Sequence, residues 1–190
     1  MNIVIIGTGY VGLVTGVGLA SLGNIVDFID LDENKIKDLS RKRITFYEPG
    51  LEEYFNDNET FKRMSFSSDY ASIEWDNIDI VFVCVQTPNN IETNSVDTKF
   101  LESAITEINN VNDNDLVITV KSTIPPYEIE KVCEKVGMDP SKLTFNPEFL
   151  REGTAVEDFF KPDRIVLGGT DTEKLSKLKE LYSSFDCEII

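Results

Sequence analysis

The stretch that decides the fold is Met1-Asn2-Ile3-Val4-Ile5-Ile6-Gly7-Thr8-Gly9-Tyr10-Val11-Gly12-Leu13. A short apolar run enters a turn whose glycines follow the G-x-G-x-x-G spacing, and a helical pattern of apolar residues leaves it. In this arrangement Gly7 lets the chain turn sharply, Gly9 leaves room for a pyrophosphate, and Gly12 lets helix and strand pack closely. The free N–H groups at the start of the helix would then face the phosphates of a dinucleotide.

The residues on both sides of the turn favour this interpretation over an ordinary glycine turn. Residues 3–6 are typical of a buried parallel strand, and Gly23 is placed to end the helix in a left-handed conformation. The buried side of that helix is expected to consist of Val11, Val14, Leu19 and Leu22.

A second strand, residues 24–29, ends on Asp30, which comes 18 residues after Gly12. A carboxylate at this place accepts hydrogen bonds from the ribose hydroxyls and repels a 2′-phosphate, so NAD is favoured over NADP. Lys35 is close enough along the chain to offer the cofactor a cation, or it is one more solvated lysine. The pattern predicts an NAD site that contains Asp30.

Length and charge narrow the function further. The 190 residues suffice for one large domain, 41% of them are hydrophobic, and no apolar run approaches the ~20 residues of a membrane span. No signal peptide is recognisable, so a cytoplasmic location is the default expectation. The net charge of −16, from 18 basic and 34 acidic residues, argues against a nucleic-acid or anionic-membrane surface.

The reactive side chains exclude several chemistries. The chain contains no histidine, which removes histidine-based triads, imidazole bases and most zinc sites, and no metal site is expected. Its three cysteines, Cys84, Cys133 and Cys187, are far apart and form no C-x-x-C pair. An odd number of scattered thiols fits a reducing compartment, and we expect them to be structural.

Further along the chain, strand patterns alternate with helix patterns. Strands are expected at residues 63–67, 78–85, 116–120, 143–145 and 164–167, helices at 32–42, 51–55, 126–136 and 173–182, a helical turn at 70–73, and a loose polar loop at 89–96. One more helix is expected to bury Phe100, Leu101, Ala104, Ile105 and Ile108. The order predicts an α/β, Rossmann-like, doubly wound and mainly parallel sheet with helices on both faces. Thr87 and Pro88 would then face the ligand cleft, because they follow the carboxyl end of a strand.

Four motifs in this order carry a resemblance to a known family. They are Gly7-Thr8-Gly9-Tyr10-Val11-Gly12-Leu13, Tyr47-Glu48-Pro49-Gly50-Leu51, Thr87-Pro88, and Asn146-Pro147-Glu148-Phe149-Leu150-Arg151-Glu152-Gly153. Over essentially the whole chain the sequence resembles the N-terminal half of the UDP-glucose/GDP-mannose dehydrogenase family. The Tyr-Glu-Pro-Gly-Leu element resembles most the members that oxidise UDP-glucose, whereas members that oxidise GDP-mannose share the Asn-Pro-Glu-Phe-Leu element.

The resemblance implies a function and a set of site residues. Family members oxidise the C6 alcohol of a nucleotide sugar to a carboxylate with two NAD, through a thiohemiacetal and a thioester. By position, Thr123 would hold a catalytic water, Glu148 would act as a general base or hydrolytic residue, and Glu152 would assist at the nicotinamide side. The nucleotide sugar would lie along Glu148, Phe149, Leu150 and Arg151. NAD would be lined by Gly7, Gly9, Tyr10, Val11, Gly12, Asp30, Lys35, Thr87, Thr123 and Glu152.

Part of the family's site has no counterpart in residues 1–190. In the family, the nucleophilic thiol, together with a lysine, an asparagine and an aspartate, belongs to a second, nucleotide-sugar domain. A long central helix precedes that domain, and family members usually form a homodimer through this helix. We therefore expect residues 1–190 to form only the NAD-binding, Rossmann-like domain. Two other interpretations stay open: a dehydrogenase acting on GDP-mannose or another nucleotide sugar, and a non-catalytic module that senses NAD.

Overall fold

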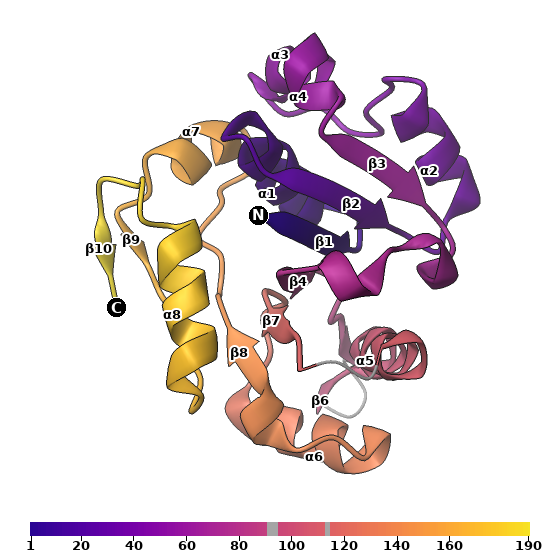
Figure 1. Cartoon of the computed structure of the whole chain (residues 1–190), viewed down its shortest axis with the longest axis vertical. Coiled ribbons are helices and arrows are strands. Elements are labelled where there is room, and N and C mark those ends of the chain that lie inside the picture. The colour runs from indigo at the N-terminus through magenta and orange to yellow at the C-terminus, as the bar shows by residue number, and fades with distance from the viewer. Residues whose placement is uncertain (91–94, 113–114) are drawn as a thin grey trace.

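A parallel sheet organises the structure (Figure 1), a computed structural model that describes residues 1–90, 95–112 and 115–190. Among these residues, six strands pair in the order β3-β2-β1-β4-β7-β8, and every pairing is parallel. The strands are β1 (Asn2–Ile6), β2 (Ile25–Ile29), β3 (Met64–Ser67), β4 (Ile80–Val83), β7 (Val117–Val120) and β8 (Leu143–Phe145). This is the doubly wound order of dinucleotide-binding folds. Strands β1 to β3 are added toward one edge of the sheet and β4, β7 and β8 toward the other, and ligands bind beyond the carboxyl ends of the strands where the order reverses, between β1 and β4.

Helices cover both faces of the sheet. They are α1 (Tyr10–Ser21), α2 (Glu33–Ser40), α3 (Leu51–Asn56), α4 (Asn58–Phe61), α5 (Lys99–Val111), α6 (Pro126–Val136), α7 (Ala155–Phe160) and α8 (Thr172–Leu181). In Figure 1, α5 and α6 lie on one side of the sheet, and α1, α7 and α8 lie on the other. Shorter 3₁₀ turns occupy Tyr70–Ser72, Trp75–Asn77 and Pro140–Lys142.

The alternation within β1 explains why two cores form. Ile3 and Ile5 point into the core beneath α1, α3, α7 and α8, whereas Val4 and Ile6 point into the core beneath α5 and α6. Because successive strand side chains point to opposite faces, an apolar run of this kind is buried on both sides. The expected Rossmann-like fold with helices on both faces is therefore confirmed.

Several local expectations were wrong. Leu22, expected on the buried side of α1, is 46% exposed, because it lies at the C-cap where the helix has already run past the core. Phe100 is 48% exposed, because it lies in the first turn of α5 at the open end of the sheet. The strand expected at residues 78–85 spans only Ile80–Val83, and the helices α4 and α7 were not predicted.

Two small ribbons lie outside the main sheet. β9 (Arg164–Ile165) pairs in parallel with β10 (Glu188–Ile189), which places part of the strand expected at residues 164–167. β5 (Asn89–Asn90) pairs antiparallel with β6 (Ser95–Val96), so a loose loop was wrong for the ends of residues 89–96. The centre of that expected loop, residues 91–94, lies outside the described residues.

Candidate functional site

The glycine turn has the geometry that its spacing predicts. Gly7 has φ +95°, and a Cβ there would lie 2.7 Å from the carbonyl oxygen of Cys84 in the neighbouring strand end. At Gly12 a Cβ would overlap the carbonyl oxygen of Gly7 and come within 3.1 Å of Cys84 Cβ, so α1 lies against the strands only because no side chain intervenes. A Cβ on Gly9 would meet nothing within 4 Å. The turn thus leaves open space at the N-terminus of α1, where a pyrophosphate binds in such folds.

Asp30 is held in place at the carboxyl end of β2. Its Oδ2 accepts hydrogen bonds from Thr8 N at 2.8 Å and Thr8 Oγ1 at 2.7 Å, and it pairs with Lys35 Nζ at 3.0 Å. Its Oδ1 accepts from Asp32 N at 3.0 Å. Burial alone would raise the pKa of Asp30, but the hydrogen bonds from Thr8, Asp32 and Lys35 outweigh it and lower the pKa below its usual range. Asp30 is therefore a fixed carboxylate, and Lys35 is its ion-pair partner.

A cavity of about 150 Å³ opens between the glycine turn and Asp30. It lies at the carboxyl ends of β1, β2 and β4, and Phe100 of α5 forms part of its wall. Its lining residues are Ile6, Gly7, Gly9, Ile29, Asp30, Leu31, Lys35, Tyr70, Cys84, Val85, Gln86, Phe100, Ser103 and Ala104. The structure thus brings four of the predicted residues, Gly7, Gly9, Asp30 and Lys35, together in one cavity. The open space beside Gly9 fits the phosphates of a dinucleotide, and the fixed carboxylate of Asp30 fits its ribose.

The other predicted cofactor residues do not line this cavity. Thr87 Oγ1 donates a hydrogen bond to the carbonyl oxygen of Thr123 at 2.9 Å, which joins the segments that follow β4 and β7. Tyr10 and Val11 form the first turn of α1 and are half-buried. Thr123 and Glu152 are exposed to solvent.

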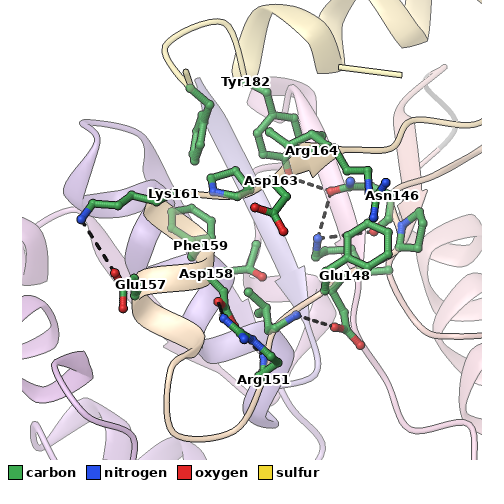
Figure 2. A pocket seen from close by; sticks show the side chains of 18 residues that line it. Asn146, Glu148, Arg151, Glu157, Asp158, Phe159, Lys161, Asp163, Arg164 and Tyr182 are labelled. Atoms are coloured by element: carbon green, nitrogen blue, oxygen red, sulfur yellow. Dashed lines mark hydrogen bonds and ion pairs between the residues drawn. The ribbon is translucent and has the colours of Figure 1, made fainter. Parts of the chain in front are cut away.

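A second cavity, of about 430 Å³, lies on the other side of the same sheet edge (Figure 2). Its lining includes Glu148, Phe149, Leu150 and Arg151, the residues predicted to contact the nucleotide sugar. Lys121, Asn146 and Tyr182 form its buried floor, and residues 157–159 and 161–165 form the opposite wall. All four residues predicted to contact substrate therefore share one hollow.

The rim of this cavity is held by ion pairs and hydrogen bonds. Arg151 pairs with Asp158 at 2.6 Å, and Figure 2 shows the two side chains turned toward each other. That guanidinium lowers the pKa of Asp158 to about 2. Glu148 Oε2 accepts a hydrogen bond from Leu150 N at 2.9 Å, which holds its carboxylate at the cavity wall.

A buried polar network beneath the cavity was not predicted. Lys121 Nζ donates to Asn146 Oδ1 at 2.9 Å, and Tyr182 donates to the same oxygen at 2.6 Å. Asn146 Nδ2 donates in turn to the carbonyl oxygen of Val166 at 3.0 Å. Burial lowers the pKa of Lys121. The position of Lys121 directly after a buried strand was the available signal, because polar residues at strand ends face the ligand edge.

Glu48 is a further residue for which the sequence predicted no role. It belongs to the Tyr-Glu-Pro-Gly-Leu motif, yet only 4% of it is exposed, and its carboxylate binds Tyr10 and the segment before α7. From the local sequence, an acidic residue between a tyrosine and a Pro-Gly turn is expected to lie at the surface. Its burial follows from tertiary contacts that no local pattern encodes.

The cysteines are placed as structural thiols. Cys133 is fully buried, and burial raises the pKa of the Cys84 thiol to about 12. Burial and the neighbouring Asp186 raise the pKa of Cys187. All three are free thiols. In the described residues no group of three or more acidic or cysteine side chains is arranged to hold a metal ion, and every helix is too short or too polar to cross a bilayer.

Comparison with known proteins agrees with this geometry. A family model described as the NAD-binding domain of the UDP-glucose/GDP-mannose dehydrogenase family matches residues 1–186. The UDP-glucose 6-dehydrogenase of Rickettsia prowazekii (strain Madrid E) is 38% identical over 185 residues, which cover 96% of this chain and 42% of that protein. The chain thus spans about two fifths of the length of this curated relative.

Two solved structures superpose on the whole chain. A GDP-mannose dehydrogenase from Pseudomonas aeruginosa does so with a TM-score of 0.90 at 29% identity, and the match covers 100% of this chain and 46% of that one. A UDP-glucose dehydrogenase from Pyrobaculum islandicum does so with a TM-score of 0.86 at 34% identity, covering 100% and 45%. The family match, the sheet order and the glycine turn together show that the chain belongs to the UDP-glucose/GDP-mannose dehydrogenase family and is its NAD-binding domain.

Proposed function

We propose that residues 1–190 form the NAD-binding half of a UDP-glucose 6-dehydrogenase, which oxidises UDP-glucose to UDP-glucuronate with two NAD. The observation that carries this proposal is the pair of cavities at one edge of the sheet. One is lined by the glycine turn and Asp30, and the other by residues 148–151. A cofactor and a sugar bound in the two cavities would approach each other at that edge, as hydride transfer requires.

On this proposal the residues of the first cavity hold NAD. The N–H groups at the start of α1 bind the pyrophosphate, Asp30 accepts from the ribose, and Tyr10, Val11, Thr87 and Thr123 continue the contact toward the nicotinamide. NAD, when bound, supplies the acceptor for the hydride that leaves the sugar. The lowered pKa of Asp30 supports this role, because an ionised carboxylate accepts hydrogen bonds from the ribose hydroxyls and repels a 2′-phosphate.

The proton that accompanies hydride loss needs a base. In a chain without histidine, Glu148 and Glu152 are the carboxylates that the family motif provides, and Glu148 lines the sugar-side cavity. A carboxylate that a bound substrate screens from water has its pKa raised toward neutrality, which suits it to accept a proton. Thr123 would orient a water molecule without adding charge.

The thiol of the proposed thioester step comes from outside residues 1–190. Support lies in the three cysteines themselves, since burial keeps Cys84 and Cys133 protonated and none of the three lies in the sugar-side cavity. A nucleophilic cysteine needs a lowered pKa and access to substrate. The free thiols fit the cytoplasm as compartment, and a homodimer would form through segments beyond this domain.

A dehydrogenase acting on GDP-mannose is the second candidate. The TM-score of 0.90 with the Pseudomonas aeruginosa enzyme favours it, while the Tyr-Glu-Pro-Gly-Leu element and the 38% identity to the Rickettsia prowazekii enzyme favour UDP-glucose. A third candidate of another class is a module that binds NAD without catalysing a reaction.

Turnover distinguishes the three candidates. The chain would be joined to the C-terminal part of the Rickettsia prowazekii enzyme that lies beyond the matched region, and NADH formation would be followed by absorbance. We expect NADH with UDP-glucose, in a ratio of two per sugar. NADH with GDP-mannose alone would replace the first candidate by the second, and NADH binding without turnover on either sugar would favour the sensing module.

A further inference from the structure

The segment between β8 and α7, residues 146–154, is neither helix nor strand, so its backbone N–H groups need other partners. Carboxylates supply several of them. Glu148 and Asp158 belong to this segment or to the helix that follows it, and each accepts one N–H from it. Glu48 comes from a loop 105 residues before Gly153, and it accepts the N–H of Gly153 in this segment and the N–H of Ala155, the first residue of α7.

The carboxylate of Glu48 is shared between two parts of the domain. Oε2 accepts from Gly153 N at 2.8 Å, and Oε1 accepts from Ala155 N at 2.8 Å. Oε2 also accepts a hydrogen bond from the hydroxyl of Tyr10 at 2.8 Å. With only 4% of Glu48 exposed, water does not compete for these bonds.

Tyr10 brings the nucleotide-binding turn into this cluster. It is the first residue of α1 and directly follows Gly9, and its hydroxyl lies 2.9 Å from the carbonyl oxygen of Arg151 as well as against Glu48. Burial and the hydrogen bond to Glu48 raise the pKa of Tyr10, so the hydroxyl keeps the proton that it donates. A continuous set of hydrogen bonds therefore runs from the start of α1 through Glu48 to residues 151–155.

We propose that Glu48 is a positioning residue that couples occupancy of the glycine turn to the backbone geometry of residues 151–155. The Gly153 N–H that Glu48 binds belongs to the peptide unit directly after Glu152, so the carboxylate fixes the chain where Glu152 projects from it. A pyrophosphate at the start of α1 restrains Tyr10, and Tyr10 in turn restrains Glu48. This inference rests on the proposed function, because it needs NAD at the turn.

A purely structural Glu48 would behave differently. It would support the segment before α7 equally with and without a nucleotide, and removing the Tyr10 hydroxyl would leave that support intact. Coupling instead requires that the protection of residues 151–155 increases when the nucleotide binds, and that this increase depends on both Glu48 and Tyr10.

The test is amide hydrogen exchange on the full 190-residue chain, with and without saturating NADH, alongside calorimetry on the same samples. Wild type is compared with Glu48→Gln, Tyr10→Phe and the control Glu52→Gln, an exposed carboxylate on α3. In Glu48→Gln we expect peptides covering residues 151–155 to exchange about tenfold faster without ligand, because an NH₂ donor replaces one of the two accepting oxygens. In wild type and the control, NADH should slow their exchange, and in both other variants that slowing should disappear.

The outcomes separate this inference from the proposed function. If wild type binds NADH and Glu48→Gln shows the same ligand-dependent slowing, the coupling is overturned and the proposed function stands. If wild type does not bind NADH, the proposed function is overturned and the coupling falls with it. If Glu48→Gln fails to fold by circular dichroism, Tyr10→Phe decides, and ligand-dependent slowing equal to that of wild type would overturn the coupling.

Discussion

Asp30 is oriented before any ligand arrives. The hydroxyl and amide of Thr8, the amide of Asp32 and the ammonium of Lys35 fix both oxygens at the carboxyl end of β2. A carboxylate held in this way loses little conformational freedom when a ribose binds, so its hydrogen bonds contribute nearly their full free energy to affinity.

Replacing Asp30 by alanine should therefore weaken NADH binding at least tenfold and reduce the preference for NADH over NADPH. Hydrogen bonds to an ionised acceptor contribute roughly 1.5–3 kcal/mol, and the repulsion of a 2′-phosphate disappears with the charge. Calorimetry on Asp30→Ala measures both affinities, with Asp38→Ala, a carboxylate on α2 whose side chain is 44% exposed, as the matched control. Unchanged affinity for both nucleotides would remove Asp30 from the site.

The Arg151–Asp158 pair should give the domain part of its acid sensitivity. A pKa of about 2 in the folded state, against about 3.9 in an unfolded chain, means that Asp158 stabilises the fold above pH 4 and loses this contribution as the pH falls toward 2. The melting temperature of Asp158→Asn should lie below that of wild type at pH 6, and the difference should shrink toward pH 2. The control Asp163→Asn, at an exposed position, should follow wild type; a difference for Asp158→Asn that is independent of pH would refute the assignment.

At the scale of elements, the turn between β1 and α1 separates packing from binding. Gly12 has no space for a Cβ, whereas Gly9 has open space beside it and an ordinary φ of −71°. One glycine is therefore required by the fold, and the other would be required by the ligand.

Two alanine variants test this separation. Gly12→Ala should lower the free energy of unfolding by about 1–3 kcal/mol, as overpacking does, and lose NADH binding as well. Gly9→Ala should keep its stability within about 0.5 kcal/mol of wild type and still bind NADH much more weakly. Chemical denaturation and calorimetry on both variants give the comparison. A Gly9→Ala protein that binds NADH like wild type would show that no pyrophosphate lies against this turn.

The same elements show what the sequence could and could not predict. Runs such as residues 3–6 and 80–83 are apolar on both faces, so the local pattern predicted their strands, and the alternation of strand and helix patterns predicted the parallel sheet. α1 is buried on nearly all sides, so the spacing of its apolar residues did not indicate which face is buried. Leu22 was therefore wrongly predicted to be buried. α7 begins where Glu48 binds Ala155 N, and such a start depends on a distant residue that local reasoning does not see.

The site was predictable to a similar degree. The spacing of the glycines and Asp30 predicted one cofactor site. The resemblance predicted that Glu148, Phe149, Leu150 and Arg151 lie along the nucleotide sugar, and in the structure these four residues line one cavity. Lys121 and Tyr182 meet at Asn146 only after three separate segments fold together. The contacts of Lys121 and Tyr182 with Asn146 could therefore not be predicted from the sequence.

At the scale of the whole molecule, the net charge of −16 opposes the approach of a dianionic nucleotide. Raising the salt concentration from 0.01 to 0.15 M shortens the Debye length from about 30 to about 8 Å, which screens this repulsion more than it screens contacts at the turn. The association rate of NADH, measured by stopped-flow fluorescence, should therefore rise a few-fold over this range. A rate that falls with salt would indicate a local positive field stronger than the net charge.

The most direct test of the account is calorimetry of NADH and NADPH, titrated separately into the 190-residue chain. We expect NADH to bind with one site per chain, because the glycine turn leaves room for the pyrophosphate. We expect NADPH to bind at least tenfold more weakly, because Asp30 repels its 2′-phosphate. Equal binding of the two nucleotides would contradict the role of Asp30. Binding of neither would contradict the claim that residues 1–190 by themselves form an NAD site.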